Sequence, residues 1–252
     1  MRKLLAVITI IALAVVGSLF YFKLRSKNIP IQKKIKASTP KQTAPASIPI
    51  KNEQPTSQAP GCGTVTDADG NTYTTIEIAG RCWMAQNMLA TKYSSASAIA
   101  NTGGDTIKAR YCYPNSNGGD YCNTEGMLYS WWSAVGLPEG SQKMIAQPVQ
   151  GICPTGWHIS DDADWTALSR AYPASQLLGY GANSVGFGAS YTGYYDGGSF
   201  LAHGTDSYYW SSDQNDSKSS FYWQFDSGFP NSELNDFSNN DAGYLVRCVK
   251  DF

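Results

Sequence analysis

Six cysteines are the residues of this chain whose type and spacing most clearly indicate a chemistry. No two of them have the Cys-x2-Cys spacing of zinc sites, and the chain has only two histidines, His158 and His203. An even number of cysteines without that spacing is typical of disulfide bonds formed in an oxidising compartment. The predicted disulfide residues, all beyond residue 60, are Cys62, Cys82, Cys112, Cys122, Cys153 and Cys248.

Aromatic side chains in the glycine-rich stretches Ala189–Ser199 and Ser207–Phe229 are the second group with a recognisable chemistry. Exposed rings can stack on the faces of sugar rings, while neighbouring Asp and Asn side chains bond hydroxyl groups. Strand alternation would bury about half of the rings. The predicted ligand-binding residues are Tyr191, Tyr194, Tyr195, Tyr208, Tyr222 and Trp223.

Two acidic segments bear on a calcium site. Asp67-Ala-Asp-Gly-Asn71 resembles an EF-hand loop, but its glycine comes too early and Ile78 stands where the loop needs a glutamate. A tight turn is therefore predicted there. The stretches 233–236 and 239–241 carry better oxygen ligands and leave calcium as an open alternative. We predict no metal and no cofactor.

The catalytic motifs that short patterns can identify are absent. The sequence contains no serine-nucleophile elbow, HExxH helix or phosphate-binding loop. The adjacent Asp161 and Asp162 are explained by a helix start. A glycosidase stays open because its two carboxylates need not be near in sequence. We predict no enzyme and no catalytic residues.

Charge divides the chain at residue 60. Residues 1–60 hold 10 of the 19 Lys and Arg and one acidic residue, Glu53. Residues 61–252 therefore hold 9 basic and 19 acidic residues, a net charge of −10. A surface of that sign repels nucleic acid, which we exclude as a partner.

The N-terminal segment predicts membrane attachment. Leu4–Phe22 has no charged residue and is long enough, as a helix, to span a thin bilayer. The alternative is a signal peptide cleaved after Ala12-Leu-Ala14, but the apolar run continues beyond it. Basic residues after the segment favour a cytoplasmic C-terminal side, whereas the cysteines favour the outside. We give the cysteines more weight.

These features divide the chain into three parts. Residues 1–22 are the predicted single-pass membrane anchor. Residues 23–60 carry six of the twelve prolines and no aromatic residue after Lys23, as in a disordered tether. Residues 61–252 are predicted to form one domain outside the cell membrane.

Strand and helix patterns within 61–252 predict an α+β domain. A hairpin is expected at Thr64–Thr66 and Thr72–Ile78, followed by a strand at Arg81–Met84. Helices are expected at Gly126–Val135 and Ser160–Tyr172, the second capped by Ser160. From Gly186 onward, aromatic strands should alternate with turns in an irregular antiparallel sheet.

The two histidines have different expected roles. His158 is expected to form hydrogen bonds within the fold, and His203 is expected to be exposed. The predicted core tryptophans are Trp83, Trp157, Trp165 and Trp210.

Several short motifs resemble those of a known bacterial family, the Fibrobacter succinogenes major paralogous domain. They occur in order as Asp69-Gly-Asn-Thr-Tyr73, Arg81-Cys-Trp-Met-Ala-Gln-Asn87, Gly126-Met-Leu-Tyr-Ser-Trp131, Cys153-Pro-Thr-Gly-Trp-His158, Asp164-Trp165, Tyr209-Trp-Ser-Ser212 and Leu245-Val-Arg-Cys-Val249. The resemblance covers about 61–252. It implies an extracytoplasmic module of C-type-lectin-like fold, with two helices and a terminal strand stapled by a disulfide. It implies no enzymatic activity.

With that resemblance, the proposed pairs are Cys153–Cys248 to close the fold, Cys112–Cys122 as a loop staple and Cys62–Cys82 in the hairpin. Six cysteines permit fifteen pairings, so others stay open. The predicted function is a membrane-anchored, non-catalytic surface module that binds a glycan or another surface polymer. The alternatives are a structural or pilus-associated subunit contacting other surface proteins, and a relative of formylglycine-generating enzymes, which would need free thiols.

Overall fold

The described residues of this computed structural model are 62–94, 109–179, 184–229 and 233–252, all within the compact unit Gln54–Phe252. The predicted anchor, 1–22, and tether, 23–60, lie outside them. Within the described residues no helix is long and apolar enough to cross a membrane.

A five-stranded sheet has the order β1-β2-β3-β12-β6, and each neighbouring pair is antiparallel. The predicted hairpin and the strand after it are confirmed with the expected bounds, as β1 (Thr64–Thr66), β2 (Thr72–Ile78) and β3 (Arg81–Met84). The C-terminal strand β12 (Cys248–Lys250) lies between β3 and β6 (Trp157–Ile159). The two ends of the domain sequence therefore meet in one sheet.

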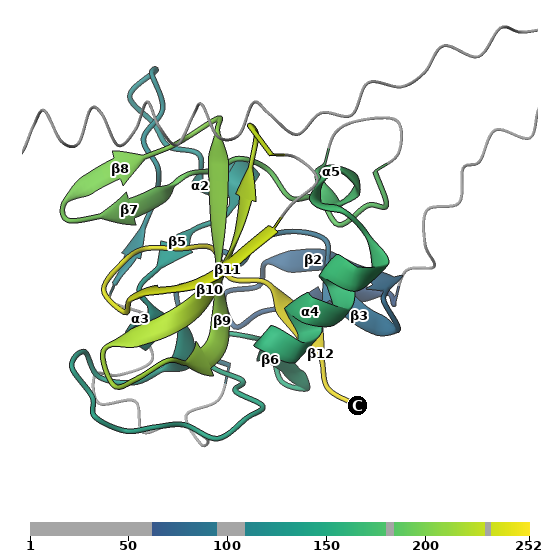
Figure 1. Ribbon diagram of the computed structural model, residues 1–252, viewed down its shortest axis with the longest axis horizontal. Helices are drawn as coiled ribbons and strands as arrows, with labels where there is room; N and C mark the ends of the chain where they lie inside the picture. Colours follow the sequence, from purple (N-terminus) through teal and green to yellow (C-terminus); the bar gives the residue numbers. More distant parts are fainter. Residues whose placement is uncertain (1–61, 95–108, 180–183, 230–232) are drawn as a thin grey trace, which may run out of the picture. The chain divides into compact units, whose positions relative to one another are not determined.

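A three-stranded antiparallel sheet, β11-β10-β9, forms the second main layer. Its strands are β9 (Asp206–Gln214), β10 (Ser219–Asp226) and β11 (Glu233–Asn239), and they cross the centre of the molecule in Figure 1. Two small ladders complete the strands of the described residues: β4 (Arg110–Tyr111) with β5 (Leu128–Tyr129), and β7 (Tyr194–Asp196) with β8 (Ser199–Leu201).

The helices of the described residues are short: α2 (Cys122–Glu125), α3 (Trp131–Val135), α4 (Asp162–Ala171) and α5 (Ala174–Leu177). The helix expected at 160–172 is α4, but its cap is Asp161, whose side chain accepts a hydrogen bond from the Asp164 amide in a capping box. The helix expected at 126–135 shrinks to α3. Leu128 and Tyr129 form β5 against β4 instead of a first helical turn.

The expected two-helix α+β, C-type-lectin-like fold is therefore wrong. Among the described residues, strands account for 36% and helices for 14%. Alternating aromatic and small polar residues in the C-terminal half pair into long strands, and only α4 has the length of an ordinary helix. The domain is mostly β.

Strand alternation distributes the aromatic residues between two cores. One core contains Trp131, Trp210 and the disulfide of Cys153 with Cys248, and the other contains Trp83 and Trp165. Adjacent residues enter opposite cores, since Tyr209 packs in the second and Trp210 in the first. All four tryptophans predicted to be core are buried, with exposed fractions of 0% for Trp83, 6% for Trp157, 1% for Trp165 and 0% for Trp210.

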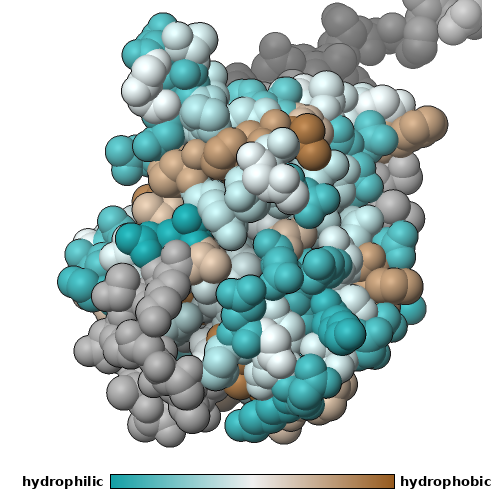
Figure 2. Space-filling model, turned by 90° about the vertical axis from the view of Figure 1, so that its left-hand side faces the viewer, coloured by the Kyte–Doolittle hydropathy of each residue, from teal (hydrophilic) through white to brown (hydrophobic). Residues whose placement is uncertain are grey.

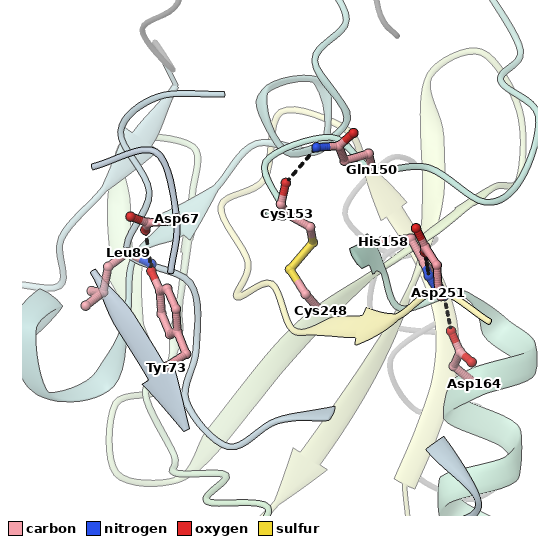
Figure 3. The surroundings of a disulfide bond; sticks show 9 residues. All are labelled: Asp67, Tyr73, Leu89, Gln150, Cys153, His158, Asp164, Cys248 and Asp251. Atoms are coloured by element: carbon pink, nitrogen blue, oxygen red, sulfur yellow. Dashed lines mark hydrogen bonds and ion pairs between the residues drawn. A yellow bond between two sulfur atoms is a disulfide. The ribbon is translucent and has the colours of Figure 1, made fainter. Parts of the chain in front are cut away.

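All three proposed disulfides are present. Cys62–Cys82 joins the start of the domain to β3, Cys112–Cys122 closes a loop, and Cys153–Cys248 connects the segment before β6 to β12. The last bridge is fully buried, and the Gln150 side chain donates a hydrogen bond to the Cys153 carbonyl beside it (Figure 3). No cysteine has a free thiol.

A buried arginine joins β3 to the loop before β7. The guanidinium of Arg247 is fully buried and donates to the Asn87 side-chain oxygen at 2.6 and 2.9 Å, and to the carbonyls of Met84 and Phe187. It also lies 4.2 Å above the Phe187 ring. Burial lowers the pKa of this guanidinium, which nevertheless stays charged and is held by neutral acceptors.

His158 on β6 lies between two carboxylates, as Figure 3 shows. Its Nε2 is 2.9 Å from Asp164 of α4, and its Nδ1 is 2.7 Å from Asp251 in the C-terminal tail. Asp164 also pairs with Arg81 at 2.6 Å. The expectation that His158 bonds within the fold is confirmed, and the network ties the tail to α4 and β3.

This network makes stability depend on pH. Burial lowers the pKa of His158, but hydrogen bonds to Asp164 and Asp251 outweigh it and raise that pKa above its ordinary value. The stabilisation is complete below the unfolded pKa of about 6.5 and is lost as pH rises through the folded pKa. We expect the free energy of unfolding, measured by urea denaturation, to fall across this range in the wild type and much less in His158→Gln. The same decline in both proteins would contradict the assignment.

Candidate ligand-binding site

Three of the six predicted ligand-binding residues meet on one surface. Tyr194 of β7, Tyr208 of β9 and Tyr222 of β10 are half-buried and surround the ring of Tyr244, which is 4% exposed. Tyr208 lies 4.6 Å from Tyr194 and 5.6 Å from Tyr222, between ring centroids. We call Tyr194, Tyr208 and Tyr222, with Tyr244 beneath them, the tyrosine patch.

Sheet geometry explains why these rings meet. In the antiparallel pairing of β9 with β10, Tyr208 is opposite Gln224 and Tyr222 is opposite Trp210. These four residues therefore share one face of the sheet, and Tyr209 and Trp223 share the other. Tyr244 supports the patch from below, with its ring 5.2 Å from both Tyr208 and Tyr222 and 4.3 Å from the buried Trp210. The patch thus rests on a rigid core.

Polar groups hold the hydroxyls of Tyr208 and Tyr244 in place. The Gln224 amide donates to the Tyr208 hydroxyl at 2.9 Å and to Asp206 at 2.8 Å, and the Tyr244 hydroxyl donates to Ser238 at 3.0 Å. Burial and then the charge of Asp206 raise the pKa of Tyr208. Burial and then the charge of Asp236 raise the pKa of Tyr222. Both hydroxyls stay protonated at neutral pH and can donate or accept hydrogen bonds.

The other three predicted residues do not join the patch. Trp223 is 6% exposed, stacks on Trp165 in the core and donates to Asp162 from its indole nitrogen. Tyr195 stacks on Tyr111 with ring centroids 3.9 Å apart. Gly243 allows this stack, because a Cβ there would lie 2.8 Å from the Tyr111 ring. Tyr191 is half-buried against the second core.

The predicted turn at Asp67 is confirmed. Its carboxylate accepts hydrogen bonds from the backbone amides of Asp69 and Asn71, the Asn71 side chain and the Tyr73 hydroxyl, the last at 2.7 Å (Figure 3). In the described residues, the one His, Cys, Asp or Glu group with metal-like spacing is Cys112, Asp120 and Cys122. Its cysteines form a disulfide, so it offers no thiolate ligand.

His203 differs from its expected exposure. Its ring is half-buried, stacks on Tyr121 with centroids 4.3 Å apart and lies 3.1 Å from a Glu125 oxygen. These contacts join the loop after β8 to α2. The arrangement has a structural explanation and contains no nucleophile.

Residues 76–250 match one family model, the Fibrobacter succinogenes major domain, which includes every quoted motif except Asp69–Tyr73. The chain belongs to this family. No curated protein and no solved structure matches it significantly. In this Fibrobacter succinogenes major domain the match runs from β2 to β12, so it includes the tyrosine patch and the buried Arg247, while Cys62 precedes it.

The sequence of this Fibrobacter succinogenes major domain was not used to predict Gln224 and Tyr244, the residues that support the tyrosine patch. Alternation along β10 could have separated the patch residue Tyr222 from the core residue Trp223 and placed Gln224 beside Tyr222. No local signal could have found Tyr244, because it reaches the patch from the irregular segment after β11.

The side of the domain that carries β7 and β8 in Figure 1 faces the reader in Figure 2. This face is mostly hydrophilic, with a band of hydrophobic residues in its upper part and scattered hydrophobic residues elsewhere. A polar face of this kind fits a hydrated ligand better than a permanent apolar interface.

Proposed function

We propose that this domain is a non-catalytic binding module that recognises a glycan or another hydroxyl-rich surface polymer outside the cell membrane. The observation that carries the proposal is the convergence of Tyr194, Tyr208 and Tyr222 around Tyr244, with part of each outer ring open to solvent. Their faces offer apolar area for the C–H surface of a sugar ring at little cost in side-chain entropy.

The polar surroundings of the patch support the same ligand class. Asp206, Gln224 and Asp236 lie beside the rings and have oxygens that can accept hydrogen bonds from hydroxyl groups. Tyr208 is already oriented by Gln224, so binding would cost little additional ordering.

Three disulfides support a location outside the cytoplasm, where such bridges persist. We propose that the uncharged segment Leu4–Phe22 attaches the chain to the membrane.

A glycan array probed with the full-length chain in mild detergent tests the proposal. We expect binding to defined saccharides, weakened about tenfold or more by Tyr222→Ala, because one stacking ring contributes about 1–2 kcal/mol. Tyr222→Phe should retain most of the binding, since the ring remains. Phe252→Ala is the matched control, because Phe252 is exposed and lies over Arg81 of β3.

Two results would contradict binding of a glycan at the tyrosine patch. Binding that is insensitive to Tyr222→Ala would place the ligand elsewhere. An array without any bound glycan would favour the structural alternative, a surface subunit acting through protein contacts. That alternative is supported by Phe237, which is 52% exposed on β11, the outer strand of the three-stranded sheet in the described residues.

A further inference from the structure

A polar pocket of about 500 Å³ lies at one end of the three-stranded sheet. Ser219 and Asn239, the last opposed pair of β10 and β11, form part of its wall. Trp132 is 4% exposed, and its indole nitrogen donates to Asp241 at 3.1 Å, which fixes that carboxylate. We call this the Trp132 pocket; its remaining lining residues are Glu139, Gly140, Gln142, Asp216 and Lys218.

The Trp132 pocket is close to the tyrosine patch along the strands. Ser219 precedes Tyr222 by three residues on β10, a separation of roughly 10 Å at the usual strand rise, and strand alternation turns their side chains to opposite faces of the sheet. The two sites are also linked through Tyr244, whose hydroxyl donates to Ser238 of β11. A saccharide that contacts both sites would therefore pass around the end of the three-stranded sheet.

Negative charge predominates in both places. Glu139, Asp216 and Asp241 line the Trp132 pocket against one cation, Lys218. Asp206 and Asp236 lie beside the tyrosine patch, where their charges act on Tyr208 and Tyr222. The sequence from 61 onward has the same sign, with a net charge of −10. An anionic polymer would therefore be repelled at each contact, and a cationic group would be attracted.

We infer that the Trp132 pocket and the tyrosine patch together select amine-bearing or neutral saccharides over acidic ones. The pocket carboxylates bind the protonated amines of amino sugars. Gln142, Ser219 and Asn239 form hydrogen bonds with the hydroxyl groups of any saccharide. This inference rests on the proposed glycan-binding function and adds the charge class of the ligand.

Three matched oligosaccharides test the inference: oligomers of glucosamine, of N-acetylglucosamine and of galacturonic acid, of equal length. Affinities for the full-length chain are measured at mildly acidic pH, where the amines are charged, and at low and high salt. We expect the glucosamine oligomer to bind about tenfold more tightly than the neutral one, the size of one favourable charge pair, and high salt to reduce this preference.

The decisive variants are Asp216→Asn and Asp241→Asn. Asparagine keeps an oxygen that can accept from Trp132, so the pocket should keep its shape. We expect both changes to reduce the preference for glucosamine to about twofold or less, mainly by weakening the binding of glucosamine. Residues 1–60 are basic and could hold galacturonate nonspecifically, so only binding lost in Tyr222→Ala is assigned to the site.

Three outcomes would overturn the inference. Tyr222-dependent binding that is equal for all three oligomers, or strongest for galacturonate, would refute charge selection while leaving the proposed function in place. A glucosamine preference that survives both Asp→Asn changes would remove the Trp132 pocket from the explanation. If no oligomer shows Tyr222-dependent binding, the inference fails, and the glycan array tests the proposed function separately.

Discussion

Replacing both Cys153 and Cys248 with alanine is expected to lower the free energy of unfolding by about 4–5 kcal/mol. The bridge spans 95 residues, and in the chain-entropy model the stabilisation increases with the length of the closed loop. It also joins the segment before β6 to β12, the strand that lies between β3 and β6 in the five-stranded sheet and pairs with both. A loss of that size is a large part of the stability of an ordinary domain.

The matched control is the double replacement of Cys112 and Cys122 with alanine. The disulfide between these two cysteines closes a loop of only 10 residues. The same relation gives about 2–3 kcal/mol for that loop. Denaturation by urea, followed by tryptophan fluorescence, compares the two variants directly. An equal or larger loss from the Cys112 and Cys122 replacements would show that loop closure is not the source of the stabilisation.

Replacing Arg247 with methionine is expected to cost roughly 3–5 kcal/mol, because each buried acceptor left without a donor costs about 1–3 kcal/mol. Methionine fills much of the space but leaves the Asn87 oxygen and the Met84 and Phe187 carbonyls without their donor. Arg247→Lys should also be strongly destabilising, because an ammonium group cannot reach all three acceptors in the planar geometry of a guanidinium.

Arg170→Met provides the control for Arg247, since Arg170 is exposed on α4 and its replacement should change stability by about 0.5 kcal/mol or less. Soluble yield and thermal unfolding midpoint of the purified variants give the comparison. Near-wild-type melting of Arg247→Met would mean that the buried guanidinium is dispensable to the fold.

Local sequence signals predicted the N-terminal part of the fold well. Asp67, Gly70 and Asn71 have strong turn preferences of their own, so the β1–β2 hairpin and β3 could be placed by residue. The start of α3 was predicted too early, because Leu128 and Tyr129 pair with β4, a strand that lies far from them in sequence. Pairing with a distant strand overrides local helix periodicity, and no single-sequence pattern reports it.

The sequence predicted part of the candidate site, and the rest depends on contacts between segments that are distant in sequence. Tyrosine-rich strands indicated where exposed rings would be, and three of them do meet in the tyrosine patch. Which rings are exposed depends on the register between β9 and β10 and on Tyr244 from another segment. The Trp132 pocket depends on contacts between α3, the β9–β10 turn and the end of β11, which sequence spacing does not encode.

NMR of the tyrosine rings tests most directly whether the tyrosine patch binds a saccharide. The chain has 16 tyrosines, and selective ring labelling with single Tyr→Phe variants would assign their signals. On titration with a glycan that the array identifies, we predict that the signals of Tyr194, Tyr208 and Tyr222 shift together while that of Tyr172, at the end of α4, stays unchanged. Glycan binding that leaves all three patch signals unmoved would contradict the account.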